Sequence, residues 1–575
     1  MSRRRLPQAP RRVSRRAFVA NGVTAYFAAT LLPTTASWAE GTRQPTTQRS
    51  INVMNFLRAE EPREPQDLFR PLKEQMALIR GHRLPATWLL QYDALVEGPF
   101  VPFLKAEMPA EHECGIWLEM NRKICDDAGV EWRGRKDWEW DYHVPVAYTI
   151  GYTPEERRKL ADAAMRRFRQ VFGHDAKVVA SWNLDAVTVA HLSDHYAVDA
   201  FANCRDQIAT DGFTIWGGPI AGYYPSRTNA WSPALSARNQ IATPMFRLLG
   251  QDPVYYYDNQ MSQPDTMEPV WKSGQSPVFV DSFLKMIAEG ATQGFAYAQL
   301  GQENSFGWPA MKGYAMQMEK LAAVRDAGRV HVETMSETGR RFKRAFRSTP
   351  AQAQVMLADP FDTKPGQRTV WYQSQWYRAN LHFRGEDFYL RDLHVYNDRF
   401  REPYLAEVVR QHGIEQRLLA VLDGYHWSDD AVRAGRDGLR ARGRLLVQGS
   451  DQRATPLRMC GTPAVRETAA ELRVTVPACE GRTVEVAFSP REVALRVRGG
   501  SEAEQLIVEF EWVRERSALR SVTADRMLYR FREFDYAMRV ANGTVAATES
   551  GARVVTKRSG ALRLLLAQES VAAAV

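Results

Sequence analysis

Acidic and amide side chains follow several short apolar segments of this chain. In the stretch QLGQENSFGW, residues 299–308, Gln302 and Glu303 come soon after the apolar run GFAYA, and Glu119 ends the run CGIWLE. Two carboxyl groups facing one cleft can hydrolyse a glycosidic bond, because one protonates the leaving oxygen while the other attacks the anomeric carbon or activates water. We therefore expect Glu119 and Glu303 to form the catalytic pair of a glycosidase. The alternative is structural: Glu119 at a helix start, Glu303 as a loop carboxylate that accepts backbone hydrogen bonds.

Other polar and aromatic side chains occupy similar positions after apolar runs. Asp206 is a third catalytic candidate, as acid, base or acceptor for a sugar hydroxyl. The expected substrate-binding residues are Glu60, Asp93, Trp117, Trp182, Asp185, Arg205, Trp216, Tyr223, Asp258 and Gln302. Such a mixture suits sugars, whose C–H faces stack on aromatic rings while their hydroxyls need polar partners. Asp185 and Asp206 are also typical of helix N-caps or arginine partners, and the tryptophans are equally typical of a core.

The elements that must position these residues alternate between strand and helix from Ile51 to about Glu337. The predicted strands are residues 51–57, 86–91, 114–119, 177–182, 197–203, 213–218, 254–257, 294–300 and 329–333. Each is too short for a helix. Regular alternation predicts parallel strands joined by helices, hence a (β/α) barrel of seven or eight strands whose catalytic side chains gather where the strands end.

The helices between these strands carry their own signals. In residues 153–173, Thr153 is placed to cap a helix, Pro154 occupies its first position, Glu156 completes a capping box and Gly173 ends it. Amphipathic patterns predict further helices at residues 67–82, 276–293 and 309–328.

In the C-terminal part the sequence pattern changes from alternating strands and helices to mostly strands. We expect three parts: an export signal at residues 1–39, a catalytic barrel at 40–344, and at 345–575 a mainly antiparallel β domain resembling a sandwich. One helix is predicted within the last part, at residues 402–424. Cys460 and Cys479 could bridge neighbouring strands, and the other three cysteines are expected to be buried thiols.

The first 39 residues predict export from the cytoplasm. Seven arginines and no acidic residue precede an apolar run, and SRRAF, residues 14–18, is similar to the twin-arginine motif read by the Tat translocase. We expect cleavage after Ala39, a periplasmic or secreted protein, and no stable membrane span, because the apolar run is shorter than the ~20 residues that a span needs. Without these arginines the net charge of +9 falls to about +2, which argues against nucleic acid as a partner.

No cofactor is expected. The chain has no GxGxxG motif after a strand, no CxxCH and no P-loop, and its cysteines lack the spacing of a zinc or iron–sulfur site. The expected partner is a polysaccharide or oligosaccharide substrate.

The succession LRAEEPR, ATWLLQYDAL, HECGIWLEM and TPEERRKLADAAMRRFRQVFG resembles the polysaccharide deacetylase and related glycoside hydrolase superfamily over roughly Ile51–Asp211. The resemblance implies a (β/α) barrel, often of seven strands, that acts on carbohydrate. Deacetylases of this family hold a divalent metal with paired aspartates after the first strand and an HxxxH-type pair after the third. This chain has NFLRAEE and Met120-Asn121-Arg122 at those places, which disfavours metal-dependent deacetylation and directs the expectation toward hydrolases with two carboxylates.

Two alternatives remain open from the sequence. One is a carbohydrate deacetylase or lyase with an atypical metal site built from His143, Asp141 and Glu60. The other is a non-catalytic glycan-binding protein on a degenerate barrel.

Overall fold

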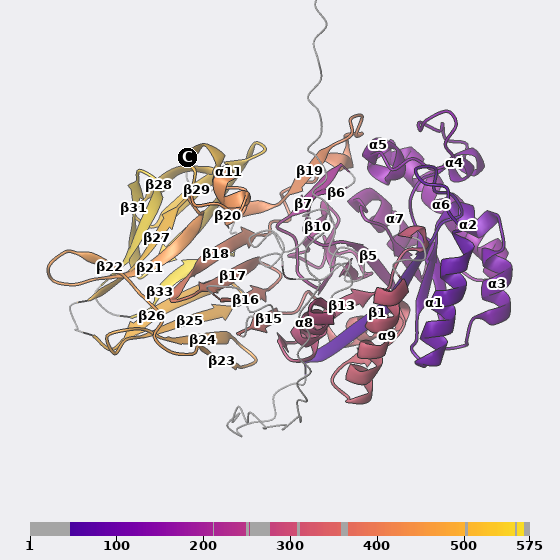
Figure 1. Ribbon diagram of the computed structural model, residues 1–575. Helices are drawn as coiled ribbons and strands as arrows, with labels where there is room; N and C mark the ends of the chain where they lie inside the picture. Colours follow the sequence, from indigo (N-terminus) through magenta and orange to yellow (C-terminus); the bar gives the residue numbers. More distant parts are fainter. Residues whose placement is uncertain are drawn as a thin grey trace, which may run out of the picture. The chain divides into compact units, whose positions relative to one another are not determined.

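Seven parallel strands form a barrel-like sheet in the described part of the chain (Figure 1). The computed structural model describes residues 47–210, 212–248, 252, 277–306, 311–357, 366–500, 504–557 and 560–567. In sheet order the seven are β13 (Phe295–Leu300), β1 (Gln48–Leu57), β2 (Thr87–Leu90), β3 (Glu113–Trp117), β4 (Val178–Ala180), β5 (Ala200–Cys204) and β11 (Met245–Leu248). β14 (His331–Val332) also pairs with β1, and β8 (Gly222–Tyr223) runs antiparallel to β11. Among the described residues no strand pairing joins β11 to β13, so the barrel is not closed by hydrogen bonds.

Helices connect and cover the barrel strands. They are α1 (Phe69–Gly81), α2 (Tyr92–Val96), α3 (Phe100–Glu107), α4 (Arg122–Ala128), α5 (Val144–Ala147), α6 (Pro154–Phe172), α7 (Ala186–His195), α8 (Pro277–Ala288), α9 (Met311–Asp326) and α10 (Met335–Ala345). The local signals of α6 are confirmed: Thr153 and Glu156 form the capping box, and Gly173 ends the helix at a φ of 82°. In the described residues no helix is both long and apolar enough to cross a membrane.

Two kinds of prediction lie outside the described residues. The export segment, residues 1–39, is one of them, and the strand at 254–257 with the adjoining Asp258 is the other.

One predicted barrel strand is not part of the barrel. Residues 213–218 contain β7 (Phe213–Trp216), which pairs with β6 (Gln207–Thr210) and β19 (Ile414–Arg417) in a separate three-stranded sheet. Its expected place beside β5 is taken by β11, a strand that the sequence analysis did not identify. β11 has only four residues, and one of them is the buried Arg247, so its apolar pattern is interrupted by a charge.

The predicted helix at residues 402–424 is wrong. The segment forms a short 3₁₀ turn, η5 (Pro403–Leu405), and then β19 and β20 (Leu419–Asp423). Gly413 adopts a φ of 97°, which ends any helical run. The apolar residues that follow it pair with β7 and with a strand of the large C-terminal sheet, so tertiary pairing outweighs helix propensity.

Two antiparallel sheets make up the C-terminal part, as the β-rich composition predicted. The larger contains β12 (Ala291–Gln293), β15 (Gln352–Met356), β16 (Gln367–Gln373), β17 (Tyr377–Arg384), β18 (Asp387–Val395), β21 (Arg442–Gln448), β27 (Gln505–Glu511), β32 (Gly551–Thr556) and β31 (Gly543–Thr548), with β20 beside β18 and β22 (Ala454–Pro456) beside β21. The second contains β23 (Ala464–Glu467), β24 (Leu472–Pro477), β25 (Thr483–Ser489), β26 (Glu492–Arg498), β33 (Leu562–Leu565), β30 (Phe534–Ala541), β29 (Arg526–Phe531) and β28 (Leu519–Thr523).

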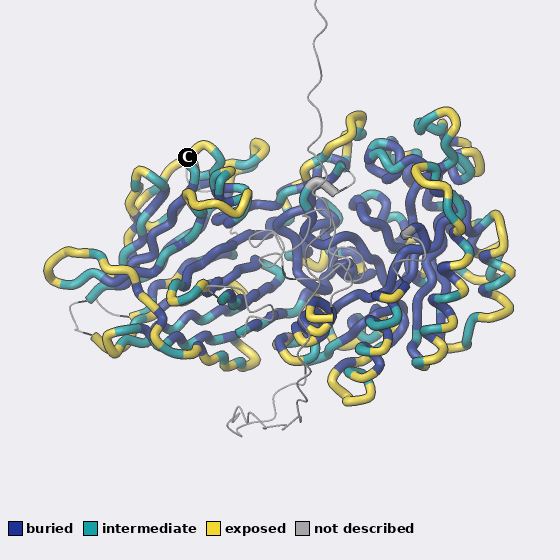
Figure 2. Tube along the Cα trace, viewed as in Figure 1, coloured by how far each residue is buried: buried dark blue, intermediate teal, exposed yellow. Residues whose placement is uncertain are grey.

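Side chains from both sheets form one core, as in a sandwich. The rings of Tyr372 on β16 and Phe488 on β25 stack with their centroids 5.6 Å apart. Figure 2 shows buried residues along the barrel strands and along both sheets, with exposed residues at the turns. A disulfide joins Cys460 to Cys479, and the remaining cysteines, Cys114, Cys125 and Cys204, are buried thiols as expected.

The large sheet and the barrel share one stretch of chain. β12 pairs with β15 in the large sheet, and only Gly294 separates it from β13 in the barrel. Backbone hydrogen bonding therefore passes from one sheet to the other within ten residues, 291–300.

Candidate active site

Arg58 is the centre of a buried charge cluster where the barrel strands end. Its Nη1 lies 3.2 Å from Oε2 of Glu61, and its Nη2 lies 3.5 Å from Oε2 of Glu119 and 3.1 Å from Oε2 of Glu303. The guanidinium also lies over the ring of Trp140, 4.2 Å from its centroid. Arg58 is only 3% exposed, and the glutamates around it are also buried. The predicted pair Glu119 and Glu303 therefore does meet in space, on one nitrogen of a residue outside the predicted set.

Short structural links place each member of this cluster. Arg58 directly follows β1, and Glu119 lies two residues beyond β3 with its backbone N–H donating to the carbonyl of Trp117. Glu303 follows β13 after Gly301, whose φ is 112°. A Cβ at Gly301 would lie 2.0 Å from the carbonyl oxygen of Met54 on β1, so only glycine allows this close approach.

Asn304 fixes the loop of Glu303 against the loop of Arg58. Its side-chain oxygen accepts from the backbone N–H of Arg58 at 3.1 Å, and its side-chain nitrogen donates to the carbonyls of Arg58 and Leu68. The polar residues after β13 therefore have two roles. Asn304 joins its own loop to the loop of Arg58, and Glu303 belongs to the charge cluster.

Arg58 has the largest influence on the electrostatics of the cluster, because it contacts all three glutamates. Burial alone would lower the pKa of Arg58, but Glu303, Glu119 and Glu61 together raise it above its ordinary value. Burial would raise the pKa of Glu61, but Arg63 and Arg58 hold it below its ordinary value. Arg63 also lies over the rings of Trp140 and Tyr142 and extends the cluster outward.

Four side chains near the ends of neighbouring strands have buried polar atoms with no hydrogen-bond partner among the described residues. They are both amide atoms of Gln91 and Asn183 and the indole nitrogens of Trp117 and Trp140. Gln91 follows β2, Trp117 ends β3, Asn183 follows β4, and Trp140 is bridged to Asn121, just beyond Glu119. Buried polar groups are almost always hydrogen-bonded to protein, water or ligand. We therefore expect these groups to bind a polar ligand or ordered water at this end of the barrel.

The predicted aromatic residues of this region pack on one another. Trp117 stacks on Phe56 with ring centroids 4.1 Å apart, and Trp182 lies edge-on to Trp117 at 4.8 Å. Trp182 is 9% exposed and Trp117 1%. Trp182 therefore exposes more of its ring than Trp117 does. Trp117 contributes an indole N–H that has no hydrogen-bond partner among the described residues.

Asp93 supports the loop that carries the cluster. Its carboxylate accepts backbone N–H bonds from Glu60 at 3.0 Å and from Ala94 at 2.6 Å. Burial raises the pKa of Asp93 to about 6, against the opposing effect of these hydrogen bonds and of Arg58. Asp93 therefore acts on the site by anchoring the loop rather than by facing a ligand.

This pKa predicts a pH dependence of stability. Between about pH 3.9, where an unfolded aspartate titrates, and about pH 6, the folded protein keeps a proton that the unfolded chain has lost. The contribution of Asp93 to the free energy of unfolding should therefore fall as pH rises through this window and stay level above it. Urea unfolding of the wild type and of Asp93→Asn at pH 4, 5, 6 and 7 measures it, as the difference between the two proteins. A difference that does not change with pH would contradict the prediction.

Asp206 and Arg205 lie at the other side of the barrel, after β5, and face the large sheet. Asp206 forms an ion pair with Arg378 on β17 and accepts from the backbone N–H of Gly217 at 3.0 Å. Arg205 donates to Gln354 on β15 at 3.3 Å, and burial lowers its pKa to about 10. The structure therefore does not bring Asp206 to Glu119 and Glu303.

Four further predicted residues have structural partners. Trp216 packs against Tyr425, with ring centroids 5.4 Å apart, and the hydroxyl of Tyr223 donates to the carbonyl of Ala230 at 2.7 Å. Asp185 caps α7 by accepting from two of its backbone N–H groups and pairs with Arg157. The backbone of Gln302 bonds to Asn55 and Gln75.

Residues missed from the candidate set are Arg58, Gln91, Asn183 and Trp140. Arg58 directly follows a predicted strand and Gln91 ends one, so position at a strand end was the available signal. The sequence places Arg58 at the end of the first strand, but it does not show that this cation contacts Glu119 and Glu303.

The cluster does not fit a resident metal ion. Three carboxylates converge, but the guanidinium of Arg58 occupies the point where their charges meet. Among the described residues, no group of three or more His, Cys, Asp or Glu side chains is placed to hold a metal. The alternative set fails as well: His143 lies 3.5 Å from Asp141, but Glu60 does not complete a group with them. His112 is held structurally by Trp88 and the carbonyl of Leu84.

Comparison with known proteins finds similarity in the fold alone. No protein-family model and no curated protein matches the sequence. A protein from Parabacteroides distasonis described as a glycoside hydrolase/deacetylase is 13% identical, with a TM-score of 0.46 over 65% of this chain and 91% of that one. A family 4 carbohydrate esterase from Streptomyces lividans is 9% identical, with a TM-score of 0.25 over 51% and 96% of the two chains. An acetyl xylan esterase from Clostridium thermocellum is 9% identical, with a TM-score of 0.24 over 50% and 89%.

The glycosidase predicted from Glu119 and Glu303 is wrong. One of the similar solved structures is described as a glycoside hydrolase/deacetylase, and several others are described as deacetylases or esterases alone. The geometry gives the physical reason, because both carboxylates are turned to the guanidinium of Arg58 instead of standing apart on two sides of a substrate.

Proposed function

We propose that the protein is a carbohydrate-active enzyme that removes acyl groups from a glycan at the carboxyl end of the barrel, without a resident metal ion. The observation that carries this proposal is the position of Glu303, held by Arg58 among strand ends that carry buried, unpartnered N–H donors. Hydrolysis of an acyl group requires a base for water and N–H donors for the oxyanion. Both kinds of group are present at this end of the barrel.

Glu303 is the base in this proposal. One of its oxygens contacts Arg58 and the other accepts from the hydroxyl of Ser305 at 2.8 Å. Glu303 takes a proton from water as the water oxygen bonds to the acyl carbon, and the acyl oxygen becomes an oxyanion. The intermediate then expels the sugar oxygen or nitrogen, which takes the proton back from Glu303. The products are a carboxylic acid and a free hydroxyl or amine.

The unpartnered donors supply the remaining chemistry. The indole N–H groups of Trp117 and Trp140 and the amide groups of Gln91 and Asn183 are preorganised by burial, so they can stabilise an oxyanion or bind sugar hydroxyls without first giving up protein partners. Arg58 keeps Glu303 and Glu119 in fixed positions, and its charge offsets theirs.

A second candidate is a glycan-binding barrel with no catalytic activity. One observation favours it: Glu119 and Glu303 contact the same nitrogen of Arg58, so both carboxylates already have a charged partner within the protein.

Acetate release by residues 40–575 tests the proposal. The substrates are acetylated xylan and N-acetylchitooligosaccharides, each with and without EDTA. We expect release that EDTA does not change and that Glu303→Gln lowers by about 10²-fold or more, the usual contribution of a general base. Glu319→Gln, at an exposed site on α9, is the matched control and should keep full activity.

Each other outcome has a definite meaning. Release that EDTA abolishes, or that survives Glu303→Gln, would refute the metal-free mechanism. Glycan binding without acetate release would leave the binding protein, and neither binding nor release would reject both functions.

A further inference from the structure

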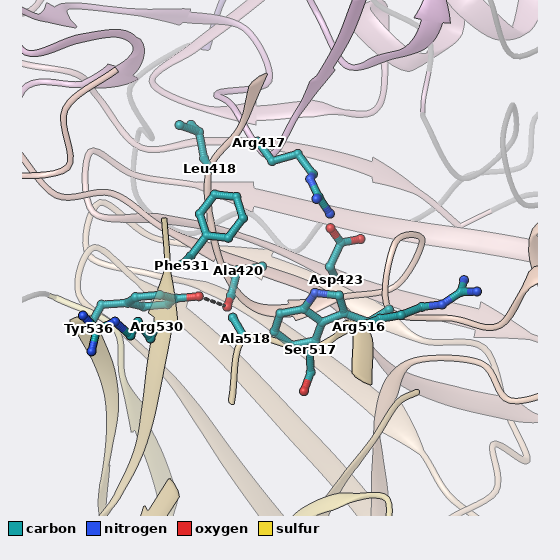
Figure 3. Close-up of a pocket in the computed structure, with 11 residues that line it drawn as sticks. Arg417, Leu418, Ala420, Asp423, Arg516, Ser517, Ala518, Arg530, Phe531 and Tyr536 are labelled. Atoms are coloured by element: carbon teal, nitrogen blue, oxygen red, sulfur yellow. Dashed lines mark hydrogen bonds between the residues drawn. The ribbon is translucent and has the colours of Figure 1, made fainter. Parts of the chain in front are cut away.

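The C-terminal part contains a cavity of about 130 Å³ far along the chain from the candidate active site (Figure 3). Its walls come from β19, β20, β29, β30 and the loop after η6 (Arg514–Arg516). This volume is roughly ten times the space that one water needs, and it is below the roughly 300–1,000 Å³ of sites for drug-sized ligands. A ligand that fills it is therefore about as large as one sugar ring.

Three aromatic and four charged side chains line the cavity. Trp427 and Phe531 contribute apolar surface, while the hydroxyl of Tyr536 already donates to the carbonyl of Ala420. Figure 3 shows the guanidinium of Arg417 directed toward the carboxylate of Asp423 at one end. The other arginines of the lining are engaged elsewhere, since Arg516 binds Asp430 and Arg530 binds Glu533. The cavity thus offers one donor group and one acceptor group beside an apolar wall.

The donor group is incompletely satisfied. Arg417 contacts Glu415 through Nη2 at 2.9 Å, but its buried Nε has no hydrogen-bond partner among the described residues. Its guanidinium lies 5.7 Å from the centroid of the Phe531 ring. An N–H buried in this way is expected to bind water or ligand.

The acceptor group is held ionised and in place. One oxygen of Asp423 accepts from the backbone N–H groups of Tyr425 and His426, and the other accepts from Nδ1 of His426 at 2.9 Å. Burial would raise the pKa of Asp423, but His426 and His394 hold it far below its ordinary value. At neutral pH the carboxylate remains an acceptor for any hydroxyl beside it.

We propose that this cavity binds a single sugar unit, with a hydroxyl between Arg417 and Asp423 and the apolar ring face against Phe531 and Trp427. A sugar hydroxyl can accept from Arg417 Nε while it donates to Asp423, a pairing that neither a small anion nor an apolar ligand provides. The inference extends the proposed function, because a second sugar site would hold the same glycan that the barrel acts on. Its test, however, is binding and not activity.

Titration of residues 40–575 with free xylose, galactose and N-acetylglucosamine, followed by saturation-transfer NMR, tests the proposal. One small ring is expected to bind with a dissociation constant on the order of 1 mM. Arg417→Met keeps the aliphatic stem but removes the donors, and should weaken binding at least tenfold. Ala518→Leu fills the cavity without changing a polar group, and should abolish binding.

Two controls separate this site from the barrel. Arg520→Met, at an exposed position on β28, should leave binding unchanged, as should Glu303→Gln in the candidate active site. Absence of binding by the wild type, or binding that Arg417→Met and Ala518→Leu both leave intact, would overturn the inference. Loss of binding in Glu303→Gln alone would assign the sugar to the barrel and overturn it as well. Acetate release in the activity test is independent of these results.

Discussion

Arg58→Met is expected to lower the free energy of unfolding by about 3–5 kcal/mol, the usual cost of removing one partner from a buried ion pair. Three buried carboxylates, on Glu61, Glu119 and Glu303, would lose the cation that their charges share. Methionine keeps the aliphatic length, so the loss measures charge and hydrogen bonding more than volume. Urea unfolding followed by far-UV circular dichroism measures it.

The matched control for Arg58 is Arg80→Met on α1. Arg80 forms an ion pair with Glu107 at 3.1 Å, but both side chains are about half exposed, so the expected change is about 0–1 kcal/mol. The loss in Arg58→Met should also shrink in acid, because the carboxylate of Glu61, whose pKa the arginines hold below its ordinary value, is protonated there and no longer needs a cation. If Arg58→Met costs no more than Arg80→Met, the cluster is not a buried charge centre.

Arg378→Met is expected to cost a similar amount, about 3–5 kcal/mol, at the contact between barrel and large sheet. Arg378 is fully buried, pairs with Asp206 after β5, and binds Asp392 on β18 through Nε at 3.0 Å. These pairs raise the pKa of Arg378 above its ordinary value although burial opposes them. Without the guanidinium, two buried carboxylates would remain without their shared cation.

A double-mutant cycle tests this contact directly. Asp206→Asn combined with Arg378→Met should cost less than the sum of the two single changes, because the second change removes a charge that the first left unpaired. Arg384→Met, at the exposed end of the same strand, should change stability by only about 0.5 kcal/mol or less. Strictly additive losses would show that Asp206 and Arg378 do not interact.

Local signals in the sequence predicted much of the barrel. The capping box and terminal glycine of α6 lie within one segment, so the sequence contains all that fixes its ends. The strands β1, β2 and β3 were equally clear, because each contains a short, mostly apolar run that is buried. Since parallel strands end at the same edge of a sheet, their positions placed Glu119 and Glu303 on one rim of the barrel, but only the structure shows that both contact Arg58.

Features that depend on distant pairing were not predictable in the same way. The apolar residues of β20 fit either a helix or a strand, and their pairing with β18, nearly 30 residues earlier, decided the outcome. β11 was missed because Arg247 interrupts its apolar pattern. This buried arginine donates to the side chain of Asn203 on β5, a contact that the sequence does not show. Asp206 is at a strand end as predicted, but the sequence could not show that Arg378 would reach it.

The role of Arg58 was hidden for a related reason. A sequence shows three glutamates and an arginine scattered between positions 58 and 303, and only the fold makes the arginine their common partner. Local patterns thus located the site, and tertiary contacts determined its chemistry.

The ten residues that pass from β12 into β13 have a consequence for how such a protein can be divided. A chain cut after residue 344 would keep β12 but lose β15, and would leave an open strand edge next to β13, the strand that leads to Glu303. The reverse fragment would lack β12 at the start of its larger sheet. Each part depends on the other for a strand pairing, so recombination that exchanged the partner domain would also have to replace β12, which continues into the strand that precedes Glu303.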